Sequence, residues 1–182
     1  AVQQSQTPPQ TPPPPNGHGH YTFAGIDASP APSKSTESMC RVVELLGVDH
    51  FGASGTIECC AFLTRIFKSI GGGDCPLVGF SGLMFAPLED SGLAAAAGKR
   101  QYGIGDLLVY STCCGIGLDT VPIPGDTPPE KMAQLARDCG TLAFRLNKPL
   151  TVRLFPCEGM KAGDTTAFES DDLCNCRVFE VP

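Results

Sequence analysis

The 182-residue sequence contains no tryptophan, only three histidines, and fewer basic than acidic residues. Thirteen Lys and Arg against nineteen Asp and Glu give a net charge of −6. Such a chain lacks the positive field that attracts nucleic acid or anionic lipid, so we expect no binding to nucleic acid. No stretch approaches the roughly 18 consecutive apolar residues of a membrane-spanning helix, so membrane insertion is not expected either.

Cysteine, in contrast, is abundant, with ten residues in the chain. Small secreted domains pair their cysteines, but a chain of this length with 42% apolar residues can build its own core. Two of the sites are adjacent pairs, Cys59-Cys60 and Cys113-Cys114, which rarely close on each other. The sequence therefore favours free thiols and an intracellular location, cytoplasmic or organellar. A disulfide framework is the alternative.

Residues 1–20 form a tract rich in Gln, Thr, Pro and Gly. Its composition predicts a Pro-rich linker or tail in polyproline II conformation, with a ligand for a proline-binding groove as the alternative. Residues 21–182 are predicted to form one domain. The first residue is Ala1 and no secretory leader pattern follows it, so we expect a processed chain, a domain of a longer protein or an engineered fragment.

Short extended runs alternate with helical periods from Tyr21 onward. Helices are predicted over residues 35–46, 57–70, 87–98 and 128–146, and a short helix or turn is predicted over residues 106–111. Strands are predicted over residues 21–27, 77–80, 114–123, 149–156 and 177–181. The clearest helix start is the sequence Thr127-Pro128-Pro129-Glu130, in which Thr127 is expected to cap, Pro128 to take the first helical position and Glu130 to complete a capping box.

This alternation predicts an α/β fold with mostly parallel strands joined by crossover helices. Ligands in such folds bind at the carboxyl ends of the strands. Three polar or Gly-rich loops lie at candidate strand ends, at residues 27–29, 52–56 and 115–119. Their convergence is the main reason to expect a site for a small polar or carboxylate ligand.

Several residues have groups suited to binding such a ligand. Asp27 and Ser29 follow the first predicted strand, and Gly55 and Thr56 begin a helix whose backbone amides could hold an anion. Ordinary helix capping is the alternative for the second pair. Two cationic side chains could hold a substrate carboxylate, with solvated charge as the alternative for both: Arg153 on a predicted strand, and Lys161 in the loop at residues 159–163.

The segment from Cys113 to Asp119 is the most suggestive of catalysis. Cys113 or Cys114, beside flexible glycines, could act as a thiolate nucleophile, and Asp119 could do acid or base work. Buried structural cysteine is the alternative. A divalent metal ion is an open possibility, because Glu89, Asp90 and Asp126 offer hard oxygen ligands. Solvated surface or a helix cap is the alternative, and Glu89 and Asp90 are also expected in the first turn of helix 87–98.

The chain also resembles a known family over residues 21–181. The run Phe23–Pro32 resembles the D-x-S-x-A-P segment of the family called domain of unknown function 711, also called uncharacterised protein family 0210. Further segments agree in order, and these are Gly55-Thr56, Gly79–Met84, Pro87–Asp90, Tyr110–Pro122, Gly125-Asp126, Lys148–Arg153 and Lys161–Asp164.

This resemblance implies the C-terminal half of an α/β barrel, similar in architecture to glycyl-radical enzymes of the pyruvate formate-lyase type. A half-barrel would leave an open sheet edge and an exposed apolar face. We therefore expect a partner, the N-terminal half of the same barrel as a separate chain, and an oligomer. No glycyl radical is expected, because Arg177-Val178-Phe179 runs directly into Glu180 instead of a radical-bearing glycine loop.

Two hypotheses for function remain. The first is an enzyme or half of an enzyme that binds a small polar or carboxylate ligand at strand ends, with metal assistance as one form of it. The second is a non-catalytic component, either a small-molecule sensor or a structural subunit of a larger assembly. A catalytic site should contain a cleft with clustered polar groups and a perturbed thiol, whereas a structural subunit should bury the same loops against a partner.

Overall fold

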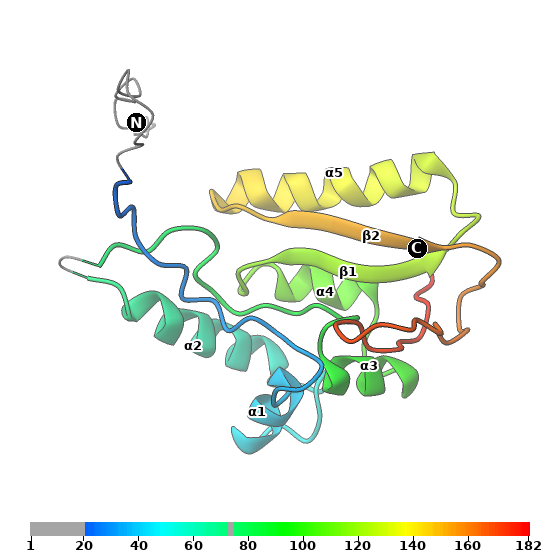
Figure 1. Cartoon of the computed structure of the whole chain (residues 1–182), viewed down its shortest axis with the longest axis horizontal. Helices are drawn as coiled ribbons and strands as arrows, with labels where there is room; N and C mark the ends of the chain where they lie inside the picture. The colour runs from blue at the N-terminus through cyan, green and yellow to red at the C-terminus, as the bar shows by residue number, and fades with distance from the viewer. Residues whose placement is uncertain (1–20, 73–74) are drawn as a thin grey trace.

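Two parallel strands lie at the centre of the fold. The computed structural model describes residues 21–72 and 75–182, so the predicted tail at residues 1–20 lies outside the described residues. Strand β1 spans Gly117–Pro124, helix α5 spans Pro129–Leu146 and strand β2 spans Thr151–Cys157. The predicted strands at 114–123 and 149–156 and the crossover helix between them are therefore confirmed, and Figure 1 shows α5 running along β2.

The two strands differ in their surroundings. Seven of the eight residues of β1 are buried, whereas most of β2 is half-buried or exposed. Strand β1 is buried along almost its whole length even though Asp119 and Thr120 interrupt its apolar residues, as expected of a strand covered on both faces. The strand register shifts between Leu118 and Val121, so two residues of β1 oppose one of β2 in a β-bulge. Thr120 lies in this bulge with a φ of 46°.

Four further helices are present among the described residues, and Figure 1 shows them on the side of β1 that faces away from β2. They are α1 at Met39–Leu45, α2 at Thr56–Ser69, α3 at Ser91–Gly98 and α4 at Ile104–Tyr110. Helix α1 is shorter than predicted because Ser38 caps it by accepting a hydrogen bond from Cys40 N. Helix α3 begins at Ser91, so the expectation that Glu89 and Asp90 lie in its first turn is wrong. Asp90 is its N-cap residue.

The predicted capping box of α5 is also wrong. The helix begins at Pro129, with Pro128 in the N-cap position and no side-chain cap. The Thr127 hydroxyl instead donates to the carbonyl oxygen of Pro124, 2.7 Å away, and closes the turn after β1. Because a threonine hydroxyl can bond to the nearest backbone on either side, local sequence alone does not decide between these two uses.

Three of the predicted strands do not form. Residues 21–27 and 77–80 share one parallel bridge, between Ile26 and Leu77, and residues 177–181 form one antiparallel bridge through Arg177. Tyr21 and Phe23 are exposed, so the first segment has the composition of a strand but no sheet to join. Extended residues need a continuous hydrogen-bonded neighbour to become a strand, and among the described residues each of these segments forms only one isolated β-bridge.

The hydrophobic core joins the sheet to the helices through an aromatic cluster. The Phe51 ring packs edge-on against Phe85, Tyr102 and Tyr110, with centroid distances of 5.0, 5.2 and 5.4 Å. Burying one such ring contributes about 2–3 kcal/mol. The C-terminal segment closes this core, because Phe179 stacks on Tyr102 and its backbone N–H donates to Pro122 on β1.

The described residues thus form a mixed α/β structure around a two-stranded parallel sheet. None of the helices among them is both long and apolar enough to cross a bilayer. None of the ten cysteines, all of which lie in described positions, forms a disulfide.

Candidate functional site

A small pocket lies where four segments of the chain meet, and it contains two of the predicted catalytic residues. Helix α2, the turn at residue 80, the segment before β1 and the segment before β2 each supply part of its wall. The cavity has a volume of about 180 Å³ and is lined by Thr64, Lys68, Phe80, Thr112, Cys113, Cys114, Gly115, Lys148 and Pro149. We call it the thiol pocket. It lies at the amino ends of β1 and β2, whereas the sequence suggested the carboxyl ends of strands.

Two glycines allow the walls of this pocket to approach each other. A Cβ atom on Gly115 would lie 2.9 Å from the Cα atom of Gly82, a distance that real side chains do not adopt. The same contact carries a hydrogen bond of 2.8 Å from Gly115 N to the carbonyl oxygen of Leu83. Gly115, which follows the cysteine pair, therefore allows the two backbone segments to pack closely.

Asp27 and Ser29 organise the turn that forms one wall. The Asp27 carboxylate accepts hydrogen bonds from the backbone N–H groups of Ser29, Phe80 and Ser81, at 2.9, 3.1 and 2.9 Å. Ser29 Oγ donates to the same carboxylate and accepts from Gly82 N. Burial disfavours the charged form of Asp27, but these hydrogen bonds outweigh it and lower the pKa of Asp27. The two residues predicted to bind ligand thus shape the Phe80 turn.

The two adjacent cysteines have different environments. Cys114 is buried, and this burial raises the pKa of its thiol, although backbone hydrogen bonds from Ile116 and Gly117 and the nearby Lys148 act against the shift. A buried thiol of this kind is chemically inert. Cys113 is half-buried and also lines the pocket. Cys113 is therefore the better placed of the two to meet a small molecule.

Two lysines give the thiol pocket its charge. Lys148 is half-buried, and its Nζ atom donates a hydrogen bond of 2.6 Å to the carbonyl oxygen of Cys114. Burial lowers the pKa of Lys148, and the positive charge of Lys68 lowers it further, while Cys114 and Cys113 act in the opposite direction. No Asp or Glu is among the residues that line the pocket. Its walls therefore carry positive charge without a compensating carboxylate.

Thr64 is the most informative residue that sequence reasoning missed. Its side chain is on α2, lines the thiol pocket and is 7% exposed. Its Oγ1 atom has no hydrogen-bond partner among the described residues. A buried hydroxyl without a partner costs free energy unless a ligand or water satisfies it. Lys68 and Thr64 lie four residues apart, a helical spacing that could have placed them on one face.

The other catalytic candidate, Asp119, belongs to a separate polar group. Its carboxylate is buried on β1 and receives hydrogen bonds from Arg153 on β2, through Nε and through Nη2 at 2.9 Å. Arg153 Nη2 also donates to Glu89 at 3.0 Å. The Asp119 hydrogen bond and the two nearby carboxylates outweigh desolvation and raise the pKa of Arg153. Predicted catalytic, ligand-binding and metal residues thus meet in one ion-pair network.

The predicted metal ligands do not gather in one place. Asp90 caps α3 through Gly92 N and Leu93 N and also accepts from Met39 N, so it joins α1 to α3. Asp126 lies in the turn after β1, and Glu89 bonds to Arg153. No cluster of three or more His, Cys, Asp or Glu side chains suited to a metal exists in residues 21–72 and 75–182. Lys161 is exposed in the loop after β2.

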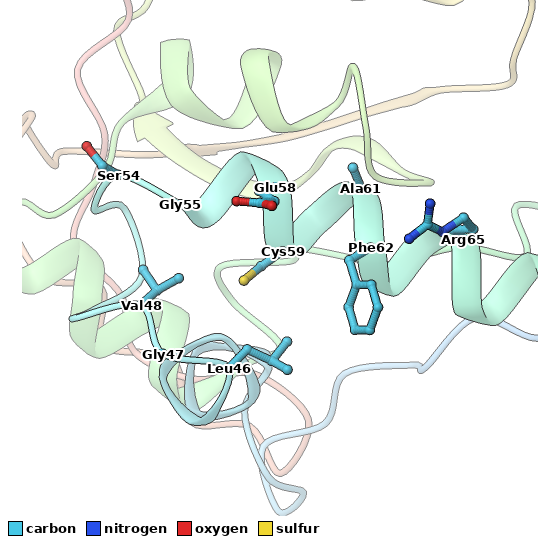
Figure 2. Close-up of a pocket in the computed structure, with 10 residues that line it drawn as sticks. All are labelled: Leu46, Gly47, Val48, Ser54, Gly55, Glu58, Cys59, Ala61, Phe62 and Arg65. Atoms are coloured by element: carbon cyan, nitrogen blue, oxygen red, sulfur yellow. The ribbon is translucent and has the colours of Figure 1, made fainter.

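Gly55 and Thr56 lie at the start of α2. Thr56 Oγ1 donates to Ala53 O at 2.7 Å and accepts from Gly52 N at 3.1 Å, so the hydroxyl fixes the turn before the helix. Gly55 also lines a larger, open pocket between α1 and α2, with a volume of about 570 Å³. Figure 2 shows Leu46 and Phe62 projecting into this space, with Glu58 and Arg65 at its rim.

Comparisons with a family model and with individual known proteins identify the same uncharacterised family. The sequence matches the family described as "Uncharacterised ACR (DUF711)" over residues 16–170. A "UPF0210 protein" of Limosilactobacillus reuteri is 34% identical over 148 residues, which cover 80% of this chain and 33% of the relative. A "UPF0210 protein" of Pelotomaculum thermopropionicum is 33% identical over the same coverage.

A third relative has a similar level of identity. The "UPF0210 protein" of Pyrobaculum arsenaticum is 35% identical over 144 residues, covering 78% of this chain and 32% of the relative. The chain therefore spans about a third of the length of the curated relatives that it matches.

Proposed function

The chain belongs to the DUF711 family of uncharacterised proteins, and on that premise we propose that it binds a small organic anion in the thiol pocket. The single observation that carries this proposal is the lining of that pocket. Two lysines, and a threonine whose hydroxyl has no hydrogen-bond partner among the described residues, line a cavity of about 180 Å³ whose lining contains no carboxylate. A carboxylate or similar oxyanion supplies the missing negative charge and hydrogen-bond acceptor.

The chemistry of the bound anion would depend on Cys113. Its thiol shares the pocket with the two lysines, and cysteine is an intrinsically strong nucleophile among protein side chains. Cys113 would then meet a carbon atom next to the anionic group. Asp119 and Arg153 act as positioning residues in this proposal, because their ion pair joins the two strands whose amino ends border the pocket.

A larger assembly is part of the proposal. The chain spans about a third of its relatives' length, and large apolar side chains are exposed in several segments: Tyr21, Phe23, Ile57, Phe62, Ile66 and Phe144. Exposed apolar surface of this kind is typical of a face that another polypeptide covers. We therefore propose that the chain forms the C-terminal half of an α/β barrel and pairs with the N-terminal half.

Free cysteines support an intracellular location within this proposal, since thiols stay reduced there. A divalent metal bound by three or more side chains would need ligands from outside the described residues. The competing function is a sensor or structural subunit that binds the same anion without reacting. Catalysis requires turnover dependent on Cys113, whereas a sensor requires only binding.

The direct test is titration of the purified chain with glycolate, a small carboxylate without an electrophilic carbon, followed by calorimetry. We expect Lys68→Gln to weaken binding about tenfold or more, because a charge-assisted hydrogen bond contributes about 1.5–3 kcal/mol. Lys99→Gln, at an exposed position after α3, is the matched control and leaves binding unchanged. Absence of glycolate binding, or equal effects of the two substitutions, overturns the proposal.

The partner is tested separately. Native mass spectrometry of the protein from its source, with metal analysis on the same sample, should detect a second polypeptide of the same family. A lone, metal-free monomer would contradict the half-barrel and favour the sensor or structural function.

A further inference from the structure

Lys148 has an unusual position for a lysine in this chain. Its side chain is half-buried, and the short bond from Nζ to the Cys114 carbonyl oxygen holds the amine at the wall of the thiol pocket. Other lysines, including Lys34, Lys99 and Lys161, are exposed. The charged and titratable groups that share the pocket with Lys148 are Lys68, Cys113 and Cys114, and the lining contains no carboxylate. The amine thus lacks an anionic partner there.

We infer that Lys148 is a nucleophile that forms an imine with a small aldehyde or ketone carrying an acid group. This inference rests on the proposed function, because the same pocket must first bind the acid group. Lys68 is the cation that holds that group, and Lys148 is the amine that meets the adjacent carbonyl carbon. The volume of about 180 Å³ suits a short ligand of this class, since one water occupies about 30 Å³ of liquid.

The proposed step balances without an oxidant, a reductant or a metal. The lone pair of the neutral Lys148 amine forms a bond to the carbonyl carbon, and the C=O electron pair moves to the oxygen. That oxygen takes a proton and becomes the hydroxyl of a carbinolamine. The hydroxyl then leaves as water after gaining a second proton, and a C=N bond replaces the C=O bond. The nitrogen loses both of its hydrogens as protons on the way to the neutral imine, and these two protons balance the two that depart with the water.

Two neighbours assist this step. A neighbouring positive charge and partial burial both favour the neutral amine, and both lower the pKa of Lys148 here. The Thr64 hydroxyl has no hydrogen-bond partner within the part of the chain that the structure describes, and Thr64 lines the same cavity. It can therefore donate a hydrogen bond to the carbinolamine oxygen, the atom on which charge develops.

Reductive trapping tests the inference. The full chain is treated with a small amount of glyoxylate and sodium cyanoborohydride, which reduces an imine to a stable carboxymethyl amine. Peptide mass spectrometry then measures the rate of modification at each lysine. We expect Lys148 to be modified at least ten times faster than Lys34, Lys99 or Lys161. Excess glycolate should slow modification at Lys148 and leave the rate at Lys99 unchanged.

Lys148→Arg keeps the charge and the donor to Cys114 but cannot form an imine, so it should abolish the fast modification. Modification of Lys148 at the rate of the exposed lysines, with glycolate binding intact, overturns the imine and leaves the proposed function standing. Absence of both glycolate binding and fast modification overturns both. The rate comparison within the unsubstituted chain decides the question even where the variant fails to fold.

Discussion

Arg153 on β2 lies opposite the bulge of β1 and donates two hydrogen bonds to the buried carboxylate of Asp119. Asp119 is 1% exposed, whereas 52% of the Arg153 side chain is exposed. The Arg153 guanidinium therefore keeps part of its hydration, while it compensates the negative charge of the Asp119 carboxylate, which is buried away from water. A third bond, to Glu89, extends this compensation to the turn before α3.

Removal of Arg153 should destabilise the fold. Arg153→Leu leaves the Asp119 carboxylate buried without its partner, and we expect a loss of about 2 kcal/mol in the free energy of unfolding, measured with urea. A fully buried pair would lose about 3–5 kcal/mol, but Arg153 is half exposed. Arg153→Lys keeps the charge but loses the planar fork and should cost about 1 kcal/mol.

Arg41→Leu is the matched control for this substitution. Arg41 pairs with Glu44 on the surface of α1, with 57% of its side chain exposed. Exposed pairs of this kind contribute less than about 1 kcal/mol. Equal losses for the Arg41 and Arg153 variants would show that Asp119 does not depend on its guanidinium partner.

The local pattern of the sequence was sufficient for the β1–α5–β2 unit. The strand-like segment at residues 114–123, the alternating pattern at residues 149–156 and the long amphipathic period between them predict two strands with a helical crossover, and the structure has them in parallel. The strands at 21–27 and 77–80 could not be predicted correctly because a strand depends on its neighbours. Their side chains suit a sheet, but only one bridge joins them.

In the candidate site, too, local sequence predicts some residues and tertiary packing decides the others. The sequence identified Cys113 and Cys114 because an adjacent thiol pair before glycines is conspicuous locally. It could not bring Lys68 and Thr64 to the same cavity, since α2 reaches it only through tertiary packing. Nor could it show that Asp27 binds a turn 53 residues away in the sequence, because hydrogen bonds of this range depend on the completed fold.

The two adjacent cysteines should differ in reactivity. Iodoacetamide should modify Cys113 at least ten times faster than Cys114, because burial raises the pKa of the Cys114 thiol and blocks access to it. Peptide mass spectrometry after short exposure measures both rates. Cys60, which is buried, serves as a second protected thiol and should react only in urea. Equal rates at Cys113 and Cys114 in the folded chain would contradict the assignment of Cys113 to the pocket surface.

The backbone contact beside the thiol pocket should tolerate no side chain. Gly115→Ala places a Cβ atom about 2.9 Å from Gly82 Cα, so the walls must separate, and we expect a loss of about 1–3 kcal/mol together with weaker glycolate binding. Gly140→Ala is the control, since its Cβ atom would meet nothing on α5. It should stabilise the chain by about 1 kcal/mol through higher helix propensity. A neutral Gly115→Ala would contradict the tight contact.

The Asp27 carboxylate should make the fold sensitive to acid. Its pKa is lower in the folded chain than its usual value because hydrogen bonds favour the charged form. Its stabilising contribution is therefore complete above about pH 4, the unfolded pKa, and is lost as the pH falls through the lower folded value. Asp27→Asn should lower the urea midpoint at pH 7 and have a smaller effect at about pH 2.5. Asp49→Asn, at an exposed position, should show no such difference.

The Thr64 hydroxyl, which has no partner among the described residues, should lower the stability of the free chain and strengthen its binding of glycolate. Thr64→Val keeps the shape and removes a buried hydroxyl without a partner, so the free chain should gain about 1 kcal/mol of stability. The same variant should bind glycolate about fivefold more weakly, because it loses one hydrogen bond of about 1 kcal/mol.

Thr120→Val is the control that separates the effect of Thr64→Val on stability from its effect on glycolate binding. The Thr120 hydroxyl is also buried without a partner, but it lies in the β1 bulge and does not line the thiol pocket. Both residue types are β-branched, so the positive φ at this position is equally costly before and after the change. Thr120→Val should therefore stabilise the chain and leave glycolate binding unchanged. If Thr64→Val binds glycolate as well as the unsubstituted chain, the hydroxyl does not contact the anion. If it destabilises the free chain, the hydroxyl already has a partner.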